Sequence, residues 1–166
     1  MKSSVFKKEN ILKKIIMVST NNTCRSFIAE SILRQYLLDA DQKNVEVISR
    51  GLVVLFPEPV HVKAADMVIK TCGIESLDFR SAQLTQEEVE ESDLILTMTE
   101  EQKDKILEEY HGYKEIATLN EYARVEGAII DPYGMEDDDY ERCFEQIARL
   151  VKNCLLYTSD AADDRI

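Results

Sequence analysis

Short apolar runs alternate along this chain with segments of helical periodicity, and this alternation limits the possible folds more than any other feature. The run KIIMV at Lys14–Val18 is short for a helix. Its four consecutive apolar residues are typical of a strand that is buried on both faces. Strands that are separated by helices connect through crossovers, which place neighbouring strands in parallel. The sequence therefore predicts an α/β domain of three layers, in which a small parallel sheet of about four strands has helices on both faces.

Apolar periodicity and turn residues give the expected elements. The predicted strands are Lys14–Val18, Val45–Ser49, Asp93–Met98 and Glu115–Leu119. The predicted helices begin at Ser26, span His61–Cys72 and Thr85–Glu91, run from Thr99 to about Tyr110, and run from about Asp138 to Leu155. Two of the predicted helices begin with the residue pair of a capping box, Thr85 with Glu88 and Thr99 with Gln102. We expect the helix at His61–Cys72 to bury Val62, Ala65, Val68 or Ile69, and Cys72, and to stop at Gly73.

Length and composition predict one globular domain, since 45% of the 166 residues are apolar and 31% are charged. We place it at residues 13–155, after a polar N-terminal extension at residues 1–12. Residues 156–166, which end in YTSDAADDRI, lack periodicity and are expected to be an appended tail, either non-native or disordered.

Charge and cysteine usage exclude several classes of protein. A formal net charge of -12 argues against nucleic-acid binding, which starts from a basic surface. The apolar runs are too short to span a membrane, and the lysine-rich N-terminus lacks a signal-peptide core, so we expect a cytoplasmic protein. None of the four cysteines forms a C-x-x-C pair or has a histidine at ligand spacing. The sequence thus predicts no metal site and no cofactor, and mostly buried, reduced thiols.

The segment after the first predicted strand has the features of an anion receptor. It reads STNNTCRS at Ser19–Ser26, between a buried strand and the first turn of a helix. Such a junction directs backbone N–H groups and the positive end of the helix dipole at one point. Asn21 and Asn22 tolerate the positive φ that a tight anion-binding nest requires. Arg25 can grip two oxygens of a phosphate-like anion with its planar guanidinium.

Three segments resemble the low-molecular-weight protein-tyrosine phosphatases. Val18–Glu30, VSTNNTCRSFIAE, is similar to the family signature V-C-x-G-N-x-C-R-S-P-x-A-E. Asp93–Lys105 (DLILTMTEEQKDK) and Asp131–Tyr133 (DPY) resemble two further family segments. The three occur in the family's order and span nearly all of Lys13–Leu155. The resemblance implies hydrolysis of phosphomonoesters through a phosphocysteine, with a phosphate-binding loop after the first strand.

The resemblance also implies a role for each site residue. The catalytic positions fall on Ser19 as nucleophile, Arg25 as phosphate clamp and Asp131 as general acid. The implied phosphate-binding set is Thr20, Asn21, Asn22, Thr23, Cys24, Arg25 and Ser26. Asn22 would brace the loop and Ser26 would hydrogen-bond the nucleophile, while Tyr133 and the region of Leu55 and Phe56 would wall an aromatic leaving group. The chain departs from the signature at Ser19 for cysteine, Asn21 for glycine and Phe27 for proline.

Ser19 leaves the function open between turnover and binding. The field that lowers a thiol pKa cannot ionise an alcohol at neutral pH, so we expect tight binding of a phosphorylated protein or peptide and slow hydrolysis. The serine fits either an engineered substitution or a natural pseudophosphatase that binds phosphorylated residues. The expected ligand carries phosphotyrosine, or phosphoarginine, since the resemblance associates Thr23 with arginine phosphatases. Arsenate reduction would need a cysteine at position 19. By the same resemblance, Cys24 would pair with that cysteine on oxidation, and without it is expected to be a structural thiol.

Overall fold

The computed structural model describes residues 13–73 and 78–164, with side chains described as far as Leu155. Its strands are β1 (Lys13–Ser19), β2 (Val45–Gly51), β3 (Leu94–Thr97) and β4 (Ile116–Thr118). They form a four-stranded sheet in the order β2-β1-β3-β4, and each of the three strand pairings is parallel. The predicted fold class, sheet size and strand direction are confirmed.

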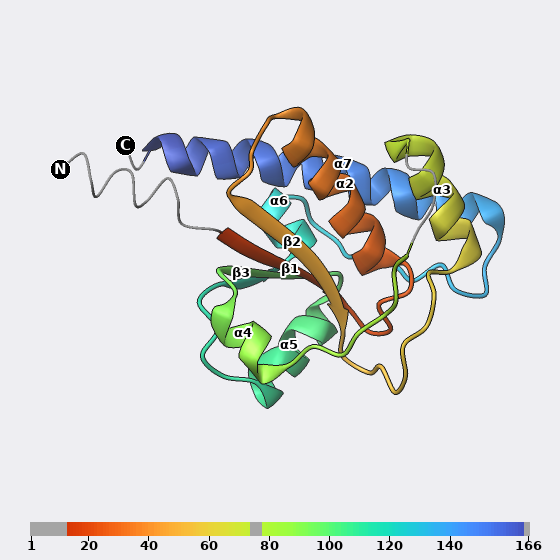
Figure 1. Ribbon diagram of the computed structural model, residues 1–166, viewed down its shortest axis with the longest axis horizontal. Helices are drawn as coiled ribbons and strands as arrows, with labels where there is room; N and C mark the ends of the chain where they lie inside the picture. Colours follow the sequence, from red (N-terminus) through yellow and green to blue (C-terminus); the bar gives the residue numbers. More distant parts are fainter. Residues whose placement is uncertain (1–12, 74–77, 165–166) are drawn as a thin grey trace.

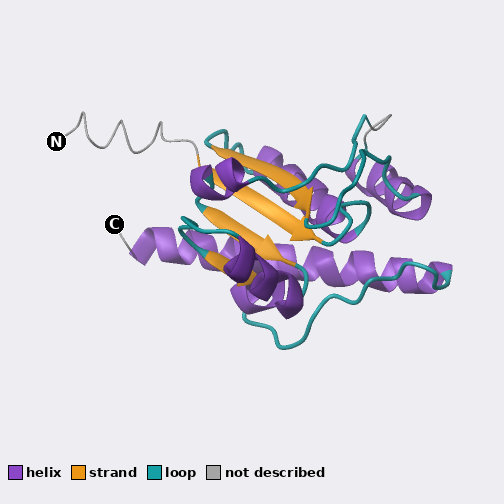
Figure 2. Ribbon diagram, turned by 90° about the horizontal axis from the view of Figure 1, so that it is seen from below, coloured by secondary structure: helices purple, strands orange, loops and turns teal. Residues whose placement is uncertain are grey.

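Helices cover both faces of this sheet (Figures 1 and 2). They are α2 (Arg25–Asp39), α3 (Val62–Cys72), α4 (Gln86–Glu91), α5 (Glu100–Glu109), α6 (Leu119–Ala123) and α7 (Asp137–Asp164). The larger layer contains α2, α3, α6 and α7, and the smaller layer contains α4 and α5. The short helix α6 follows β4 directly and was not predicted from the sequence.

The alternation of side chains along β1 and β3 explains why the apolar runs are continuous. Met17 and Leu96 point into the core beneath α2 and α7, whereas Ile16, Val18 and Ile95 point into the core beneath α4 and α5. All five are buried. Since successive residues of a strand face opposite sides, a strand covered on both faces is apolar at every position.

Local signals in the sequence set the helix ends as predicted. Thr85 and Glu88 form a capping box at the start of α4, and Thr99 with Gln102 forms one at the start of α5. Helix α3 ends at Gly73, whose φ of 70° lies in the left-handed region that glycine adopts without strain. These three predictions are confirmed.

The predicted buried face of α3 was wrong at its first residue. Val62 is 70% exposed, while Ala64 and Val68 are fully buried. Two residues advance a helix by about 200°, so a face centred on Ala64 and Val68 turns Val62 to solvent. Ala65, Ile69 and Cys72 flank this face and are half-buried.

Helix α7 is longer than predicted, since its backbone continues past Leu155 to Asp164. The assignment of residues 156–166 to an appended tail stays a prediction, and the extension at residues 1–12 lies outside the described residues. None of the described helices combines the length and the apolar character that crossing a bilayer requires.

Candidate active site

A pocket opens where β1 ends and the chain turns into α2. Its volume is about 310 Å³ when the open space at its mouth is included. Its lining residues are Ser19, Asn21, Asn22, Thr23, Cys24, Arg25, His61, Asp131, Tyr133 and Tyr140. They come from the loop after β1, the start of α3, and the segment that leads into α7.

The first turn of α2 lacks the side-chain cap that other helices of this protein have. Its N-cap residue, Cys24, makes no side-chain hydrogen bond to the helix, whereas His61, Thr85, Thr99 and Thr118 cap α3, α4, α5 and α6. The N-terminal amides of a helix need an acceptor from outside the helix, and they carry the positive end of its dipole. The start of α2 is therefore arranged to receive an anion.

Asn22 holds the loop in shape from inside the protein. It is fully buried and has a φ of 60°, a left-handed conformation that asparagine tolerates better than most residues. Its Nδ2 donates to Ser26 Oγ at 2.8 Å and Ser49 Oγ at 3.0 Å, and its Oδ1 accepts from the Ala82 N–H at 3.0 Å. Of the two asparagines expected to tolerate a positive φ, Asn22 adopts one, whereas Asn21 is exposed and does not.

A chain of hydroxyl groups joins this brace to the pocket. Ser49 donates its proton to the buried carboxylate of Glu30 at 2.6 Å, and Ser26 lies 2.6 Å from the oxygen of Ser19. Because Ser26 accepts from Asn22, its own proton is free to point at Ser19 Oγ, which also accepts from the Asn22 N–H at 3.2 Å. Ser19 Oγ thus receives hydrogen bonds from below, and its remaining proton can be directed into the pocket.

Glu30 is the ionisable group at the buried end of this network. Burial raises the pKa of its carboxyl group, which is 7% exposed, while the hydrogen bond from Ser49 and the nearby charge of Arg34 act in the opposite direction. The carboxylate also forms an ion pair with Arg34, one helical turn further along α2. The loop is thereby tied to the body of its own helix.

Arg25 brings the loop and the Asp131 segment together. Its guanidinium is 6% exposed; Nη1 donates to the Ile129 carbonyl at 2.8 Å, and Nη2 lies 3.7 Å from Asp131 Oδ2. Asp131 also accepts from the Tyr133 N–H at 3.1 Å, which fixes the turn that carries it. The pocket therefore has a cation at its floor and a partly exposed carboxylate near its mouth.

The structure brings together Ser19, Arg25 and Asp131 in one pocket, but not every residue of the predicted set. The side chain of Thr20 points away, since its hydroxyl accepts from Gln102 Nε2 at 3.1 Å. Ser26 lies beneath the loop rather than on the pocket surface, and Tyr133 lines the pocket. The predicted wall residue Phe56 does not line it: the loop after β2 directs Phe56 to solvent, where it is 69% exposed.

Two lining residues, His61 and Tyr140, were not singled out from the sequence. The rings stack at 4.9 Å between centroids, and His61 Nε2 lies 3.3 Å from the Tyr140 hydroxyl. The His61 N–H donates to the Thr23 carbonyl at 2.9 Å, which ties α3 to the loop. The sequence placed His61 at the first position of a predicted helix, but nothing local indicates its contact with Tyr140.

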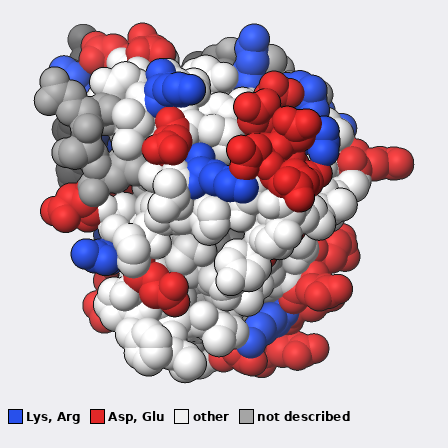
Figure 3. Space-filling model, turned by 90° about the vertical axis from the view of Figure 1, so that its right-hand side faces the viewer, with Lys and Arg blue, Asp and Glu red and all other residues white. Residues whose placement is uncertain are grey.

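Figure 3 shows the end of the molecule that lies on the right in Figure 1, where α3 and the start of α7 are found. Acidic side chains gather on one part of this face, beside a broad area without charged groups. Exposed apolar side chains of the connecting segments include Leu55, Phe56, Ile130, Tyr133 and Met135, and Val62 in the first turn of α3 is also exposed.

Comparison with known proteins identifies the family. The profile of the family described as low molecular weight phosphotyrosine protein phosphatase matches residues 14–162. The chain belongs to this family. A curated relative, the low molecular weight protein-tyrosine-phosphatase PtpB of Staphylococcus haemolyticus (strain JCSC1435), is 36% identical over 138 residues, which is 83% of this chain and 94% of that protein. The family is one of hydrolases that act on phosphotyrosine.

Solved structures of family members share the fold. The low molecular weight protein tyrosine phosphatase from T. tengcongensis superposes with a TM-score of 0.81 at 30% identity, over 87% of this chain and 99% of that chain. A Cys→Ser mutant of the YwlE arginine phosphatase, with a phosphorylated active-site serine, superposes with a TM-score of 0.76 at 31% identity, over 84% of this chain and 91% of that chain. The family match extends to residue 162 and thus into the segment that the sequence predicted as a tail.

Proposed function

We propose that this domain binds phosphorylated side chains of proteins or peptides in the pocket, and that Ser19 occupies the nucleophile position and makes turnover slow. The observation that carries the proposal is the placement of Ser19 Oγ. It lies at the end of β1 on the pocket floor, accepts from the Asn22 N–H, and contacts the Ser26 hydroxyl. A phosphoryl group held by the start of α2 and by Arg25 would lie directly in front of it.

The surroundings of Ser19 favour binding over catalysis because they provide no base. A serine nucleophile needs an adjacent group that takes its proton. The hydrogen bonds of Ser19 lead to the Asn22 N–H and to the hydroxyl of Ser26. The histidine of the pocket is engaged elsewhere: His61 Nδ1 accepts from the Lys63 N–H, and its Nε2 faces Tyr140.

The same serine favours the anion itself. A thiolate at this position repels a phosphate dianion, whereas a neutral hydroxyl can donate a hydrogen bond to it. Arg25 supplies positive charge from a buried position, where an interaction with an anion is less weakened by solvent. Asp131 lies near the mouth, where it would protonate the leaving oxygen or nitrogen if the phosphoryl group were transferred.

Phosphoarginine is a second candidate for the bound residue. Thr23 lines the pocket, and Phe56, which would stack on a phosphotyrosine ring, does not. The carboxylate of Asp131 offers an acceptor to a guanidinium group near the mouth. The similarity to the YwlE arginine phosphatase supports this candidate, as the similarity to PtpB supports phosphotyrosine.

Replacing Ser19 by cysteine tests the proposal directly. We expect Ser19→Cys to raise hydrolysis of an aryl phosphate by several orders of magnitude over the wild-type chain, and Ser19→Ala to stay inactive. In the Ser19→Cys background, Asp131→Asn should slow the reaction most for substrates with poor leaving groups. An inactive Ser19→Cys variant that still folds and binds phosphate would reject the nucleophile assignment and leave a phosphoresidue-binding module.

Calorimetry with inorganic phosphate and with phosphopeptides tests whether the pocket binds phosphorylated side chains. Arg25→Ala should weaken binding by about a hundredfold, because two hydrogen bonds to a charged group are lost at about 1.5 kcal/mol each. Arg25→Lys, which keeps the charge but not the planar guanidinium, should fall in between. Equal affinities in all three proteins would place the anion elsewhere.

Covalent capture of the phosphoryl group separates the two substrates. The phosphorylated serine in the YwlE mutant suggests that Ser19 here can accept a phosphoryl group and keep it. We expect incubation with the preferred phosphopeptide, of arginine or of tyrosine, to phosphorylate Ser19, as measured by intact mass and peptide mapping. Ser19→Ala is the matched control, and equal labelling of that variant would contradict transfer to Ser19.

A further inference from the structure

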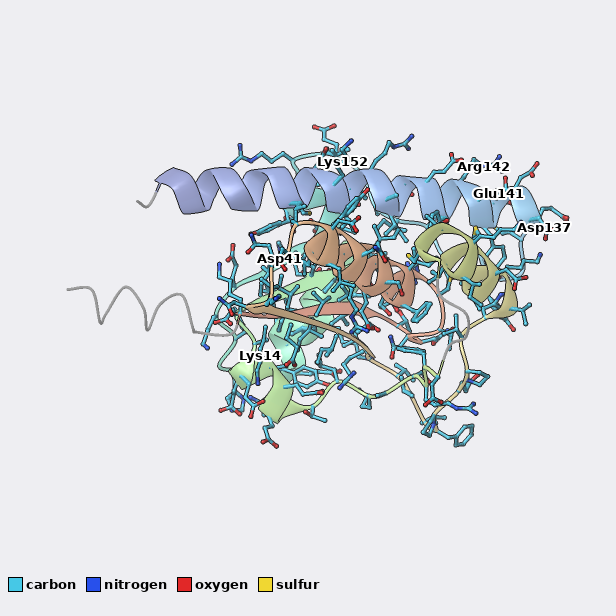
Figure 4. All side chains as sticks on the ribbon, turned by 45° about the horizontal axis from the view of Figure 1, so that its top comes forward. Lys14, Asp41, Asp137, Glu141, Arg142 and Lys152 are labelled. Atoms are coloured by element: carbon cyan, nitrogen blue, oxygen red, sulfur yellow. The ribbon has the colours of Figure 1, made fainter. Side chains whose placement is uncertain are left out.

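Tyr140 reaches the pocket from the first turn of α7. Asp137, Glu141 and Arg142, labelled in Figure 4, lie in the first turns of the same helix and are exposed. Tyr140 is only 3% exposed, and it lines the pocket. A buried tyrosine needs a hydrogen-bond partner for its hydroxyl group, so the partners of that one polar atom decide what the residue can do.

The ring of Tyr140 is held by two residues of α3 and its N-cap. It stacks on the His61 imidazole, with 4.9 Å between centroids and an angle of 18° between planes. The Lys63 ammonium lies 5.0 Å from the ring centroid and also pairs with Asp137. Such a cation over an aromatic face is attracted to it. These contacts fix the position of the ring and therefore of its hydroxyl group.

His61 determines which atom donates in its hydrogen bond with Tyr140. Its Nδ1 accepts from the Lys63 N–H at 3.3 Å, so the neutral imidazole carries its proton on Nε2. This Nε2 lies 3.3 Å from the hydroxyl oxygen of Tyr140. The imidazole is therefore the donor and the hydroxyl oxygen the acceptor, which leaves the hydroxyl proton for a different partner.

None of the side chains described, at residues 13–73 and 78–155, provides an acceptor for this proton. The hydrogen bond with His61 uses the oxygen of the Tyr140 hydroxyl and not its proton. Burial raises the pKa of Tyr140 above its ordinary value, so the proton stays in place at neutral pH. A buried donor without an acceptor is costly, and the pocket is the space from which a ligand can supply one.

We propose that the Tyr140 hydroxyl donates a hydrogen bond to an oxygen of the bound phosphoryl group, and that His61 is the positioning residue that directs it. The inference rests on the proposed function, because it assigns a further contact to the same anion. Arg25 supplies charge from the pocket floor, whereas Tyr140 adds a neutral donor from α7. A hydrogen bond from a hydroxyl group to an anionic oxygen is among the stronger ones in proteins.

His61 also connects this donor to the phosphate-binding loop. Its backbone N–H donates to the Thr23 carbonyl at 2.9 Å, while its ring contacts Tyr140. The anion would thus be held jointly by the loop after β1 and by the start of α7, with His61 between them. If the stack served packing alone, loss of the Tyr140 hydroxyl would lower stability and leave the affinity for phosphate unchanged.

Calorimetry with inorganic phosphate on the full chain separates these roles. Tyr140→Phe keeps the ring and should bind phosphate about tenfold more weakly, as expected for the loss of one hydrogen bond to a charged group. Tyr110→Phe is the matched control, because the Tyr110 hydroxyl donates to the Leu84 carbonyl at 3.0 Å and Tyr110 does not line the pocket. It should lose stability in thermal unfolding but bind phosphate as the wild type does.

His61→Asn tests the positioning role. Asparagine at the N-cap keeps an acceptor for the Lys63 N–H but lacks the Nε2 donor and the stacking ring. We expect it to weaken phosphate binding by less than Tyr140→Phe does. The double variant should bind no more weakly than Tyr140→Phe alone, because His61 acts through the hydroxyl group that is already absent. Additive losses would overturn the positioning role.

The outcomes distinguish this inference from the proposed function. Wild-type affinity in Tyr140→Phe, with binding weakened by Arg25→Ala, would overturn the inference alone. A wild-type chain that does not bind phosphate would refute the proposed function and this inference with it. If Tyr140→Phe is too unstable for calorimetry, the rise in Tm with added phosphate replaces it. That rise should be smaller in Tyr140→Phe than in Tyr110→Phe, and equal rises would again overturn the inference.

Discussion

Replacing Asn22 by alanine tests whether one buried side chain holds the phosphate-binding loop in shape. The change removes hydrogen bonds to Ser26, Ser49 and the Ala82 N–H, each of which contributes about 1 kcal/mol to stability. Alanine must also adopt the φ of 60°, at a further cost of about 1 kcal/mol. The expected loss is therefore about 4 kcal/mol, or roughly 10 °C in Tm for a chain of this length.

Urea unfolding and thermal melting of three variants would measure this loss. Asn22→Gly keeps the backbone conformation without strain and should be more stable than Asn22→Ala by about 1 kcal/mol. Asn21→Ala, at the exposed neighbouring position, should change stability by less than about 0.5 kcal/mol. An Asn22→Ala protein that melts within about 2 °C of the wild type would refute the bracing role, as would equal losses at positions 21 and 22.

Three further changes probe the elements around the site. Thr99→Ala removes the N-cap of α5 and should cost about 1 kcal/mol in urea unfolding; no change would mean that the capping box is not stabilising. Tyr140→Phe keeps the stack on His61 but removes its hydrogen bond, so a loss of about 1 kcal/mol is expected, and a gain in stability would contradict it. Glu30→Gln is tested by measuring the free energy of unfolding as a function of pH. Burial raises the pKa of Glu30 above its ordinary value of 4.5. The contribution of Glu30 to stability is therefore full below pH 4.5 and is lost as the pH rises through the pKa of the folded state. The stability of the wild type relative to Glu30→Gln should therefore fall as pH rises from about 4, and a relative rise would reject the sign of the shift.

The parts of the fold that were predicted correctly depend on neighbours in the sequence. The capping boxes at Thr85 and Thr99 and the stop at Gly73 are set within one helical turn, so their residues suffice to identify them. The position of the loop after β1, between a buried strand and the start of a helix, also follows from consecutive residues, whereas its role as an anion site stays a prediction. Val62 was misplaced because apolar periodicity alone does not give the direction in which a helix faces its neighbours.

The residues that were missed act through contacts between distant segments. His61 and Tyr140 are 79 positions apart in sequence, and their stack exists only because α3 and the start of α7 pack together. Phe56 was placed at the pocket by resemblance, but the path of the loop after β2 turns it to solvent.

The sequence by itself determined the parallel α/β class, and it predicted an anion-binding loop after the first strand with Arg25 as its clamp. The spacing of apolar residues indicates helices and strands, and the backbone N–H groups at a helix start favour an anion, so both features can be inferred from short segments of sequence. Tertiary structure decided which side chains complete the pocket, and it placed Ser19 Oγ against the Asn22 N–H and the Ser26 hydroxyl. Such features depend on the relative placement of packed helices and loops, which arises from burial summed over the whole core rather than from any one segment.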